Sequence, residues 1–379
     1  MPIARKMRLP MTVIVALNAM IGASIFTAPA ILSLSVGPAA IVSYALVTVL
    51  VLCMALAFSR VTRAYPSELP FYDYAALWGG RWAGRIAMLS YILGLTVAMG
   101  LVASFVGKYL MQYIPQLSYT TSGMLSIWPF VFANMLGVTM IQVLQYALIF
   151  FTLAPMAIIA WLSVRNFSSS NLQPFMPEGV SSIFAAVPVI IFGFFGFEAI
   201  PAISSSVKNP NKTVPRAMII SVLLTSLIYT LFIFAILSGL SRSAFTSDRM
   251  LLSDALKTVY PCIGWFGWFI DWAIIITIWG TLYSMILAIA SLIRGFFNIA
   301  LPWALILVGG AISLSFFVFS SAQMLFDLTS VGVCVAYGMT VAALYTKKCR
   351  KGFLDIVIAT AGLIAVGVVL YCAIAKYII

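Results

Sequence analysis

A single acidic residue lies deep in one of the long apolar stretches of the sequence. Glu198 falls within residues 182–205, where it is the only charged residue. A carboxyl group inside a membrane is costly to bury, and such groups commonly contact a substrate, an ion or a proton. In its neutral form the same carboxyl could instead cap a broken helix, and the sequence leaves both roles open. Asp271 and Asp327, by contrast, lie near the approximate ends of apolar runs, where we expect them to be solvated.

Two apolar segments are interrupted by small residues and, further on, by a proline. Residues 22–24 read Gly-Ala-Ser ahead of Pro29, and residues 193–196 begin and end with glycine ahead of Pro201. Glycine- or proline-interrupted helices at matching positions of two inverted halves indicate the binding site of a secondary transporter. Close helix packing is the alternative, because small residues also let neighbouring helices approach each other.

The composition points to a membrane rather than to water. Hydrophobic residues make up 63% of the chain and charged residues only 8%, against about 25% charged residues in a soluble domain. The net charge of +12 is explained by basic loops on the cytoplasmic side of a membrane, so we expect no nucleic-acid partner. The chain has no histidine, and its five cysteines lack the spacing of a metal site. We therefore expect no cofactor, no metal site and no enzymatic activity.

Eleven apolar runs are long enough to cross a bilayer, which takes about 20 residues of helix. A spanning segment must satisfy its backbone hydrogen bonds within lipid, and this favours helices. The first run is too long for the apolar core of a signal peptide, so we expect it to be a transmembrane helix. The predicted spans cover residues 11–34, 39–62, 84–112, 122–139, 143–164, 182–205, 214–240, 263–293, 301–320, 324–346 and 353–376.

The distribution of basic residues indicates the orientation of these spans. With a cytoplasmic N-terminus, 15 of the 21 Lys and Arg residues fall in cytoplasmic segments, as the positive-inside rule requires. Eleven spans then put the C-terminus outside. The 15 residues are Arg5, Lys6, Arg8, Arg60, Arg63, Arg81, Arg85, Lys208, Lys212, Arg216, Arg294, Lys347, Lys348, Arg350 and Lys351.

The order of the spans indicates an internal duplication within a single membrane domain, residues 1–379. Five helices separate equivalent positions in the two interrupted segments, and this odd number gives the two halves opposite topologies. The first half would cover residues 1–164 and the second residues 182–346, with residues 353–376 as an additional C-terminal helix.

Several short motifs occur in a fixed order along the chain. They are Ile-Gly-Ala-Ser-Ile-Phe at 21–26, Arg-Ala-Tyr-Pro at 63–66, Tyr-Asp-Tyr-Ala at 72–75, Gly-Arg-Trp-Ala-Gly at 80–84, Val-Lys-Asn-Pro at 207–210 and Val-Pro-Arg-Ala at 214–217. With these motifs the sequence resembles the amino acid–polyamine–organocation superfamily over about the whole chain, nearest to bacterial amino acid permeases and exchangers. The stretch 207–217 is the most specific part of the resemblance.

The resemblance implies an all-α fold with a 5+5 inverted repeat, shared with sodium-coupled leucine transporters, in which helices 1 and 6 are broken. It implies secondary transport of amino acids or related amines by alternating access, as proton-coupled symport or as exchange, in a bacterial cytoplasmic (inner) membrane. A transport-inactive nutrient sensor or membrane partner protein with the same fold is the alternative. The chain departs from the family at Ser24, where a second glycine is common, in the short loop 294–298, and in having eleven rather than twelve predicted helices.

The family places the substrate between the unwound parts of helices 1 and 6. Free N–H groups and the positive end of a half-helix suit the carboxylate of an amino acid, and free carbonyls suit its ammonium group. We therefore expect the carboxylate at residues 22–24, where the Ser24 hydroxyl contacts either the ligand or its own helix, and the amine near residues 192–195. The predicted substrate-binding residues are Ile21, Gly22, Ala23, Ser24, Ile25, Phe192, Gly193, Phe195 and Gly196.

Four residues are predicted to act in gating or coupling. Related exchangers carry a gating aromatic at the position of Phe192, and Trp279 is a second candidate whose alternative role is packing. Glu198 is expected to bind a coupling proton. Some proton-coupled relatives have a lysine near Thr152, and a threonine cannot supply that charge. Hydroxyls of helix 8 could ligate sodium, so the sequence leaves the coupling ion open.

Overall fold

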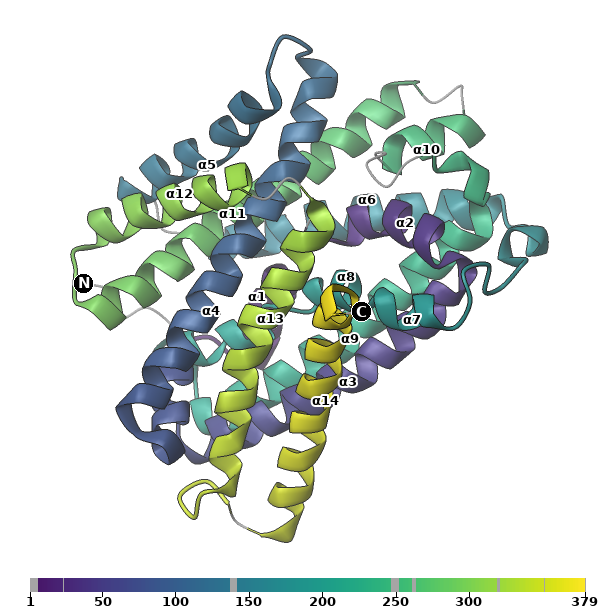
Figure 1. The fold of residues 1–379 in the computed structure, drawn as a ribbon. Helices are drawn as coiled ribbons and strands as arrows, with labels where there is room; N and C mark the ends of the chain where they lie inside the picture. The colour runs from purple at the N-terminus through teal and green to yellow at the C-terminus, as the bar shows by residue number, and fades with distance from the viewer. Residues whose placement is uncertain are drawn as a thin grey trace.

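The computed structural model describes residues 6–22, 24–136, 142–246, 252–260, 264–318, 321–350 and 352–378. The regular structure of these ranges is helical (Figure 1). The α-helices are α1 (Leu9–Met20), α2 (Ser24–Ser35), α3 (Ala40–Ala64), α4 (Pro70–Tyr113), α5 (Tyr119–Met135), α6 (Gln142–Arg165), α7 (Ser181–Ala185), α8 (Val187–Phe192), α9 (Pro210–Gly239), α10 (Leu252–Val259), α11 (Gly264–Phe297), α12 (Leu301–Val318), α13 (Ala322–Val341) and α14 (Phe353–Ile378). The 3-10 helices are η1 (Gly37–Ala39), η2 (Ser169–Leu172), η3 (Phe197–Ala199), η4 (Pro201–Ser206), η5 (Arg242–Ala244) and η6 (Ala342–Tyr345).

Long apolar helices dominate the described part of the chain. Nine helical segments within it are long and apolar enough to cross a membrane, and the bent pair α1 and α2 makes a tenth if it is counted as one span. The prediction of a polytopic α-helical membrane protein is therefore confirmed. The predicted span 122–139 corresponds to α5, whose 17 residues are too few to count as a span by length. The end of that prediction lies outside the described residues.

Helices 1 and 6 of the predicted order are both interrupted at the small residues. The first consists of α1 and α2, which are bent by 47° relative to each other. The second runs from α7 and α8 into η3 and η4, and Gly196 at the junction has a φ of 129°. A side chain is disfavoured in this conformation, and an added Cβ would also lie only 2.5 Å from the Ala19 carbonyl oxygen. The second break therefore requires glycine where it touches the first helix.

The third helix of the predicted order starts earlier than expected. α4 begins at Pro70, in the first helical turn where proline is tolerated, and runs for 44 residues to Tyr113. Gly80 interrupts it with a φ of 67° and a ψ of −165°. The part before Gly80 is therefore a separate helical segment, and its polar residues explain why hydropathy placed the start of the span at residue 84.

Several contacts between helices follow the predicted internal repeat. If each of the first five predicted helices is exchanged with the helix five places later, these pairs of helices in contact become pairs that are also in contact. α4 packs against α13, and the corresponding pair α11 and α6 is also in contact. The pairs α4–α5 and α11–α12 correspond in the same way, as do α1–α9 and α8–α3. α3 contacts α9 and α4 contacts α11, and each of these two pairs corresponds to itself. Each of these contacts therefore has a counterpart.

Glycines allow α4 and α13 to approach each other closely. An added Cβ at Gly332 would lie 2.8 Å from the Cα of Gly94, and one at Gly94 would lie 2.9 Å from the backbone N of Val333. Small residues let transmembrane helices come into backbone contact in this way. The contact fixes the position of α4 one turn after Tyr91.

The segment before α1 pairs with the end of the second interrupted helix. The Met7 N–H donates to the Ser206 carbonyl at 2.8 Å, and the Lys208 N–H donates to the Met7 carbonyl at 2.8 Å. The start of α1 and the end of η4 therefore lie on the same side of the molecule.

The prediction that Asp271 and Asp327 are solvated is wrong. Both residues are buried, with 0% and 2% of their surface exposed. The Tyr113 hydroxyl donates to Asp271 at 2.5 Å, and the Tyr377 hydroxyl donates to Asp327 at 2.9 Å. Tyrosines at the ends of α4 and α14 thus replace water as hydrogen-bond partners of these carboxyl groups.

Candidate functional site

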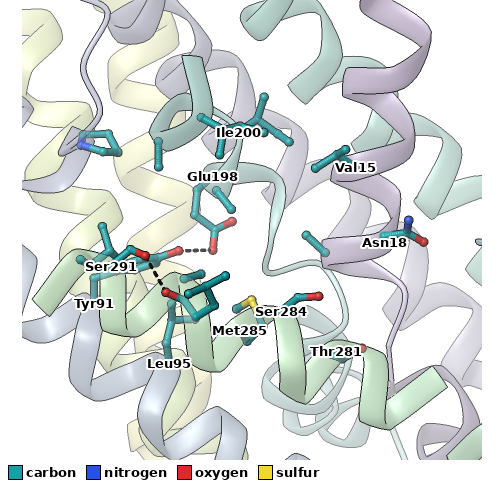
Figure 2. Close-up of a pocket in the computed structure, with 18 of the residues that line it drawn as sticks. Val15, Asn18, Tyr91, Leu95, Glu198, Ile200, Thr281, Ser284, Met285 and Ser291 are labelled. Atoms are coloured by element: carbon teal, nitrogen blue, oxygen red, sulfur yellow. Dashed lines mark hydrogen bonds between the residues drawn. The ribbon is translucent and has the colours of Figure 1, made fainter. Parts of the chain in front are cut away.

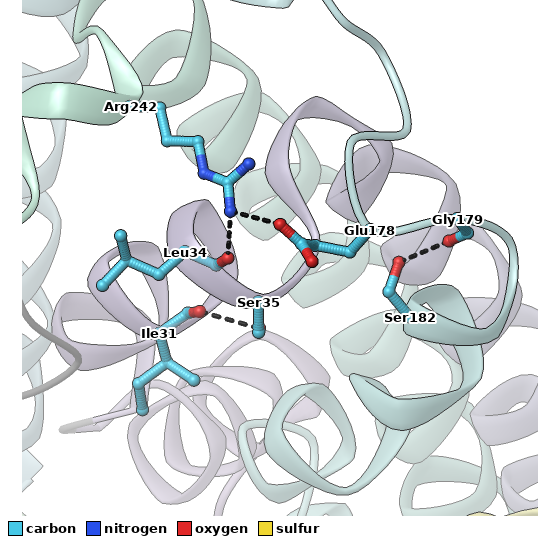
Figure 3. A network of polar contacts seen from close by, with 7 residues as sticks. All are labelled: Ile31, Leu34, Ser35, Glu178, Gly179, Ser182 and Arg242. Atoms are coloured by element: carbon cyan, nitrogen blue, oxygen red, sulfur yellow. Dashed lines mark hydrogen bonds and ion pairs between the residues drawn. The ribbon is translucent and has the colours of Figure 1, made fainter.

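A cavity of about 760 Å³ lies between α1, α4, α6, α11 and the 3-10 segments that follow α8 (Figure 2). Most of the side chains that line it are apolar, among them Leu95, Leu148 and Met285. Hydroxyl groups of α11 add polar atoms to its wall, including those of Thr277 and Thr281. Small-molecule sites typically have volumes of about 300–1,000 Å³, so this cavity is large enough for an amino acid.

The cavity opens between the start of α4 and the end of α11. Glu68 and Ser291 line it there and are exposed. Thr281 lines it ten residues earlier in α11, which corresponds to about 15 Å along the helix. Ile203 of η4 also lines the cavity, and η4 ends beside Met7. The mouth therefore lies on the side of the molecule where α1 begins.

The charged side chains that line the cavity, among the described residues, are all carboxylates: Glu68, Asp73 and Glu198. At the mouth, the Ser67 hydroxyl donates a hydrogen bond to Asp73. Such a lining disfavours an anionic side chain in the cavity and offers no basic side chain to a carboxylate. A substrate carboxylate would have to be bound by backbone N–H groups or by neutral side chains, such as the hydroxyls of α11 or the amide of Asn18.

Both carboxyl oxygens of Glu198 are hydrogen-bonded in the wall of the cavity. The Tyr91 hydroxyl of α4 donates to Oε1 at 3.1 Å, and the Gly196 N–H donates to Oε2 at 2.7 Å. Figure 2 shows Glu198 directed towards Tyr91. Glu198 is 1% exposed. The carboxyl group therefore caps the interrupted helix and lines the cavity at the same time, so the two roles that the sequence leaves open do not exclude each other.

A tyrosine of α9 joins the two interrupted helices. The Tyr229 hydroxyl lies 3.0 Å from the Met20 carbonyl oxygen and 3.1 Å from the Gly193 carbonyl oxygen. Ser24 belongs to the same contact, because an added Cβ at Gly193 would lie 2.8 Å from the Ser24 Oγ. Sequence reasoning missed both Tyr229 and Tyr91. A signal was present, since a buried tyrosine hydroxyl usually has a hydrogen-bond partner and both residues lie in apolar runs.

Three of the predicted site residues line the cavity, namely Ile21, Thr152 and Glu198. The Thr152 hydroxyl donates to the Leu148 carbonyl at 2.9 Å and lies 3.3 Å from the Thr277 hydroxyl. Thr152 therefore connects α6 to α11 in the wall of the cavity.

The other predicted substrate-binding residues lie behind the cavity wall. Gly22 faces α11, where an added Cβ would lie 3.1 Å from the Thr281 Oγ1. Ala23 lies outside the described residues. Buried in the core or at the contact between the interrupted helices are Ser24, Ile25, Gly193, Phe195 and Gly196. The structure thus brings the two predicted segments together, and the first of them reaches the cavity at Ile21.

The two predicted gating aromatics lie in different places. Phe192 is 8% exposed and packs edge to face against Phe326 of α13, with the ring centroids 5.1 Å apart. Trp279 is directed towards α5, where its ring centroid lies 6.1 Å from that of Phe130, and it also packs on Trp272. Neither Phe192 nor Trp279 belongs to the cavity wall.

Comparison with known proteins assigns this architecture to a family. The family model for amino acid permeases matches residues 9–379. The chain is 24% identical to a branched-chain amino acid permease of Lactococcus lactis, over 88% of the chain and 79% of that relative. It is 23% identical to the branched-chain amino acid permease of Bacillus subtilis, over 59% of the chain, and 27% identical to the L-methionine/branched-chain amino acid exporter of Escherichia coli, over 56% of the chain. It spans about half the length of these two relatives, 52% and 51%. The chain therefore belongs to the amino acid permease family of the amino acid–polyamine–organocation superfamily, and its function is amino acid transport across a membrane.

Proposed function

We propose that the chain transports neutral amino acids with apolar side chains, such as the branched-chain amino acids and methionine, by alternating access. The composition of the cavity wall carries this proposal, because it combines apolar side chains with carboxylates and has no Lys or Arg among its described residues. An apolar side chain gains about 25 cal/mol per Å² when it is buried against such a wall. The branched-chain permease and the methionine exporter among the relatives support the same substrate class.

The substrate would bind at the end of the cavity where the two interrupted helices meet. Its carboxylate suits the start of α2, where the positive end of the helix dipole favours an anion, but the N–H groups of Gly22 and Ser24 lie behind the cavity wall in this conformation and would be reached only when the two breaks separate. Its ammonium group suits the Gly193 carbonyl, which keeps a second lone pair beside its bond with Tyr229 and, like Gly22, would become accessible when the two breaks separate. Thr281, close to Gly22, would form the edge of this site.

We infer that the molecule is open towards the cytoplasm. The cavity mouth lies on the side where α1 begins, and the distribution of basic residues favours a cytoplasmic N-terminus. The contact between Phe192 and Phe326 would then close the external side of a bacterial inner-membrane protein. The corresponding helix contacts support two inverted five-helix halves, residues 1–164 and 182–346, followed by the additional helix 353–376.

Glu198 is the residue that we propose to couple transport to protons. Its carboxyl group lines the cavity and connects Tyr91 of α4 to the interrupted helix. Gain or loss of a proton would therefore change the hydrogen bonds between these two elements. A proton shifts the balance between two conformations only through a difference in its affinity for them. A sodium ion beside the hydroxyls of Thr152 and Thr277 is the alternative coupling ion.

Uptake into proteoliposomes tests the proposed function. Initial uptake of leucine, isoleucine, valine and methionine would be compared with that of arginine, glutamate and putrescine, with and without preloaded amino acid. We expect uptake of the apolar amino acids and little uptake of the charged substrates. Stimulation by preloading would indicate exchange, and stimulation by a proton gradient would indicate symport. Preferred uptake of arginine or glutamate would contradict the substrate class.

A further inference from the structure

Three aromatic rings form a layer on the side of the molecule opposite the cavity mouth. Phe192, at the end of α8, packs against Phe326 of α13 at 5.1 Å, and Phe326 lies 6.4 Å from Phe105 of α4. All three residues are buried, and none of them lines the cavity. Phe326 touches both of the other rings, so its position decides whether the layer is closed.

The residue after Phe326 is a buried acid that two other side chains hold in place. Asp327 is 2% exposed. The hydroxyl of Tyr377, on α14, donates to its Oδ2 at 2.9 Å, and the amide of Gln323, one turn earlier in α13, donates to its Oδ1 at 3.2 Å. Hydrogen bonds to a carboxylate are stronger than those between neutral groups. Tyr377 is therefore linked through Asp327 to the turn of α13 that carries Phe326.

α14 is also held at its opposite end and along its length. Arg60 of α3 and Asp355 near the start of α14 form an ion pair of 3.1 Å. Between the two ends, an added Cβ at Gly362 would lie 3.0 Å from the Ala57 Cβ and 3.2 Å from the Val341 Cγ1. The end of α14 lies beside α8, with which α14 is in contact (Figure 1). A helix that is held at both ends gives α13 a firm support.

We propose that Tyr377 is a positioning residue for transport. Through Asp327 it holds the first turns of α13 so that Phe326 stays against Phe192, and it thereby stabilises the conformation that is closed opposite the cavity mouth. This inference rests on the proposed function, in which the aromatic layer opens once in every transport cycle. α14 would then set how often the layer opens.

The first test compares two tyrosine substitutions on the same helix by hydrogen exchange of the full chain in lipid nanodiscs. Tyr377 and Tyr371 are similarly exposed, at 60% and 68%, but Tyr377→Phe removes the hydroxyl that donates to Asp327, whereas Tyr371→Phe removes a hydroxyl that makes no bond with Asp327. Amide exchange over residues 322–330 reports local opening of the first turns of α13. We expect exchange there to become about tenfold faster in Tyr377→Phe, as the loss of a hydrogen bond to a charged group implies. Tyr371→Phe should leave it unchanged.

Uptake kinetics provide a second measurement, the apparent KM for leucine, which would not change if the role of Tyr377 were purely structural. More frequent opening raises the population that binds substrate from the side opposite the mouth, and the apparent KM falls by at most the factor by which local opening increases, because local opening of α13 need not open the whole layer. We expect the KM for leucine on that side to fall about threefold in Tyr377→Phe and to stay constant in Tyr371→Phe. Asp327→Asn, which keeps an acceptor for the tyrosine, should give an intermediate value.

The outcomes separate this inference from the proposed function. Unchanged exchange at residues 322–330 in Tyr377→Phe would overturn the role of Tyr377 in holding α13. Faster exchange with an unchanged KM would overturn its role in transport. If the wild type carries no amino acid, the proposed function fails, and the exchange measurement alone decides whether Tyr377 holds α13.

Discussion

The Tyr91 hydroxyl and the Glu198 Oε1 lie 3.1 Å apart, and their hydrogen bond joins α4 to the interrupted helix. The second carboxyl oxygen accepts the N–H of Gly196, the glycine at which that helix breaks. A change in one carboxyl group therefore acts on two elements that line the cavity. Substitutions of Glu198 can separate its titration from its hydrogen bonding.

We expect Glu198→Gln to flatten the pH dependence of transport and to spare equilibrium substrate binding. Glutamine keeps an acceptor for the Gly196 N–H but does not titrate. Glu198→Ala should do worse, because it leaves the Tyr91 hydroxyl and the Gly196 N–H unpaired at a cost of about 1–3 kcal/mol each. Initial uptake rates from about pH 5 to 8 check this. If the wild type and Glu198→Gln share one pH profile, the role of Glu198 is structural.

Gly22→Ala should weaken substrate binding, and Gly22→Val should abolish it. The added Cβ would lie 3.1 Å from the Thr281 Oγ1 and 3.4 Å from its Cγ2, so the Thr281 side chain or the backbone at the break would have to shift by a few tenths of an ångström. Thr281→Ala removes both atoms and leaves a Cβ at 3.8 Å, an ordinary contact. The double variant Gly22→Ala/Thr281→Ala should therefore recover binding, measured by titration with leucine. In the wild type, amino acid amides, which lack the carboxylate, should compete poorly with leucine. Failure of the second substitution to restore affinity would assign Gly22 another role.

Gly196→Ala should destabilise the protein strongly. A φ of 129° costs a non-glycine residue about 1–3 kcal/mol, and the added Cβ would lie 2.5 Å from the Ala19 carbonyl oxygen. Gly310→Ala in α12 is the matched control, because an added Cβ there meets nothing within 4 Å. Thermal unfolding in detergent should show a lower transition for Gly196→Ala and no decrease for Gly310→Ala. Equal transitions would contradict the need for glycine at the break.

Tyr229→Phe should slow transport about tenfold, because two buried carbonyls at the helix breaks lose their common donor, at a cost of about 1–3 kcal/mol. The ring itself stays, and with it the packing of Tyr229 on Phe194. Tyr146→Phe, at a residue of α6 that is 51% exposed, controls for the loss of a hydroxyl. Uptake of leucine by the two variants is the measurement. Comparable rates in both would mean that Tyr229 does not join the breaks during transport.

Reporter fusions should place the loop between α13 and α14 and the C-terminus on opposite sides of the membrane. α14 has 26 residues and is about 39 Å long, enough to cross a hydrocarbon core of about 30 Å. With a cytoplasmic N-terminus, the loop should report the cytoplasm. The same side for both fusions would remove α14 from the set of spanning helices.

The positions of the long helices and of the two breaks could be predicted because they depend on local chemistry. Apolar runs must be helical in lipid, and small residues mark where a helix is interrupted, as at Gly22 and Gly196. The start of α4 at Pro70 escaped prediction, since the segment before Gly80 is helical without being uniformly apolar.

The surroundings of single side chains could not be predicted in the same way. Asp271 is buried because Tyr113, 158 residues away in sequence, supplies a hydrogen bond, and no local pattern specifies such a partner. Trp279 is directed towards α5 and away from the cavity because of how α11 is rotated about its axis. Pairings between distant helices fix both features, and hydropathy carries no information about them.

The pairing of Met7 with residues 206–208 has a consequence for how the chain tolerates sequence change. Both hydrogen bonds join main-chain atoms, so exchange of the side chains at these positions leaves the donors and acceptors intact. Proline at position 7 or 208 is the exception, because it has no N–H to donate. The link between the start of α1 and the end of η4 can therefore survive extensive sequence drift that would erase any side-chain contact. The two segments would still be joined at the mouth of the cavity.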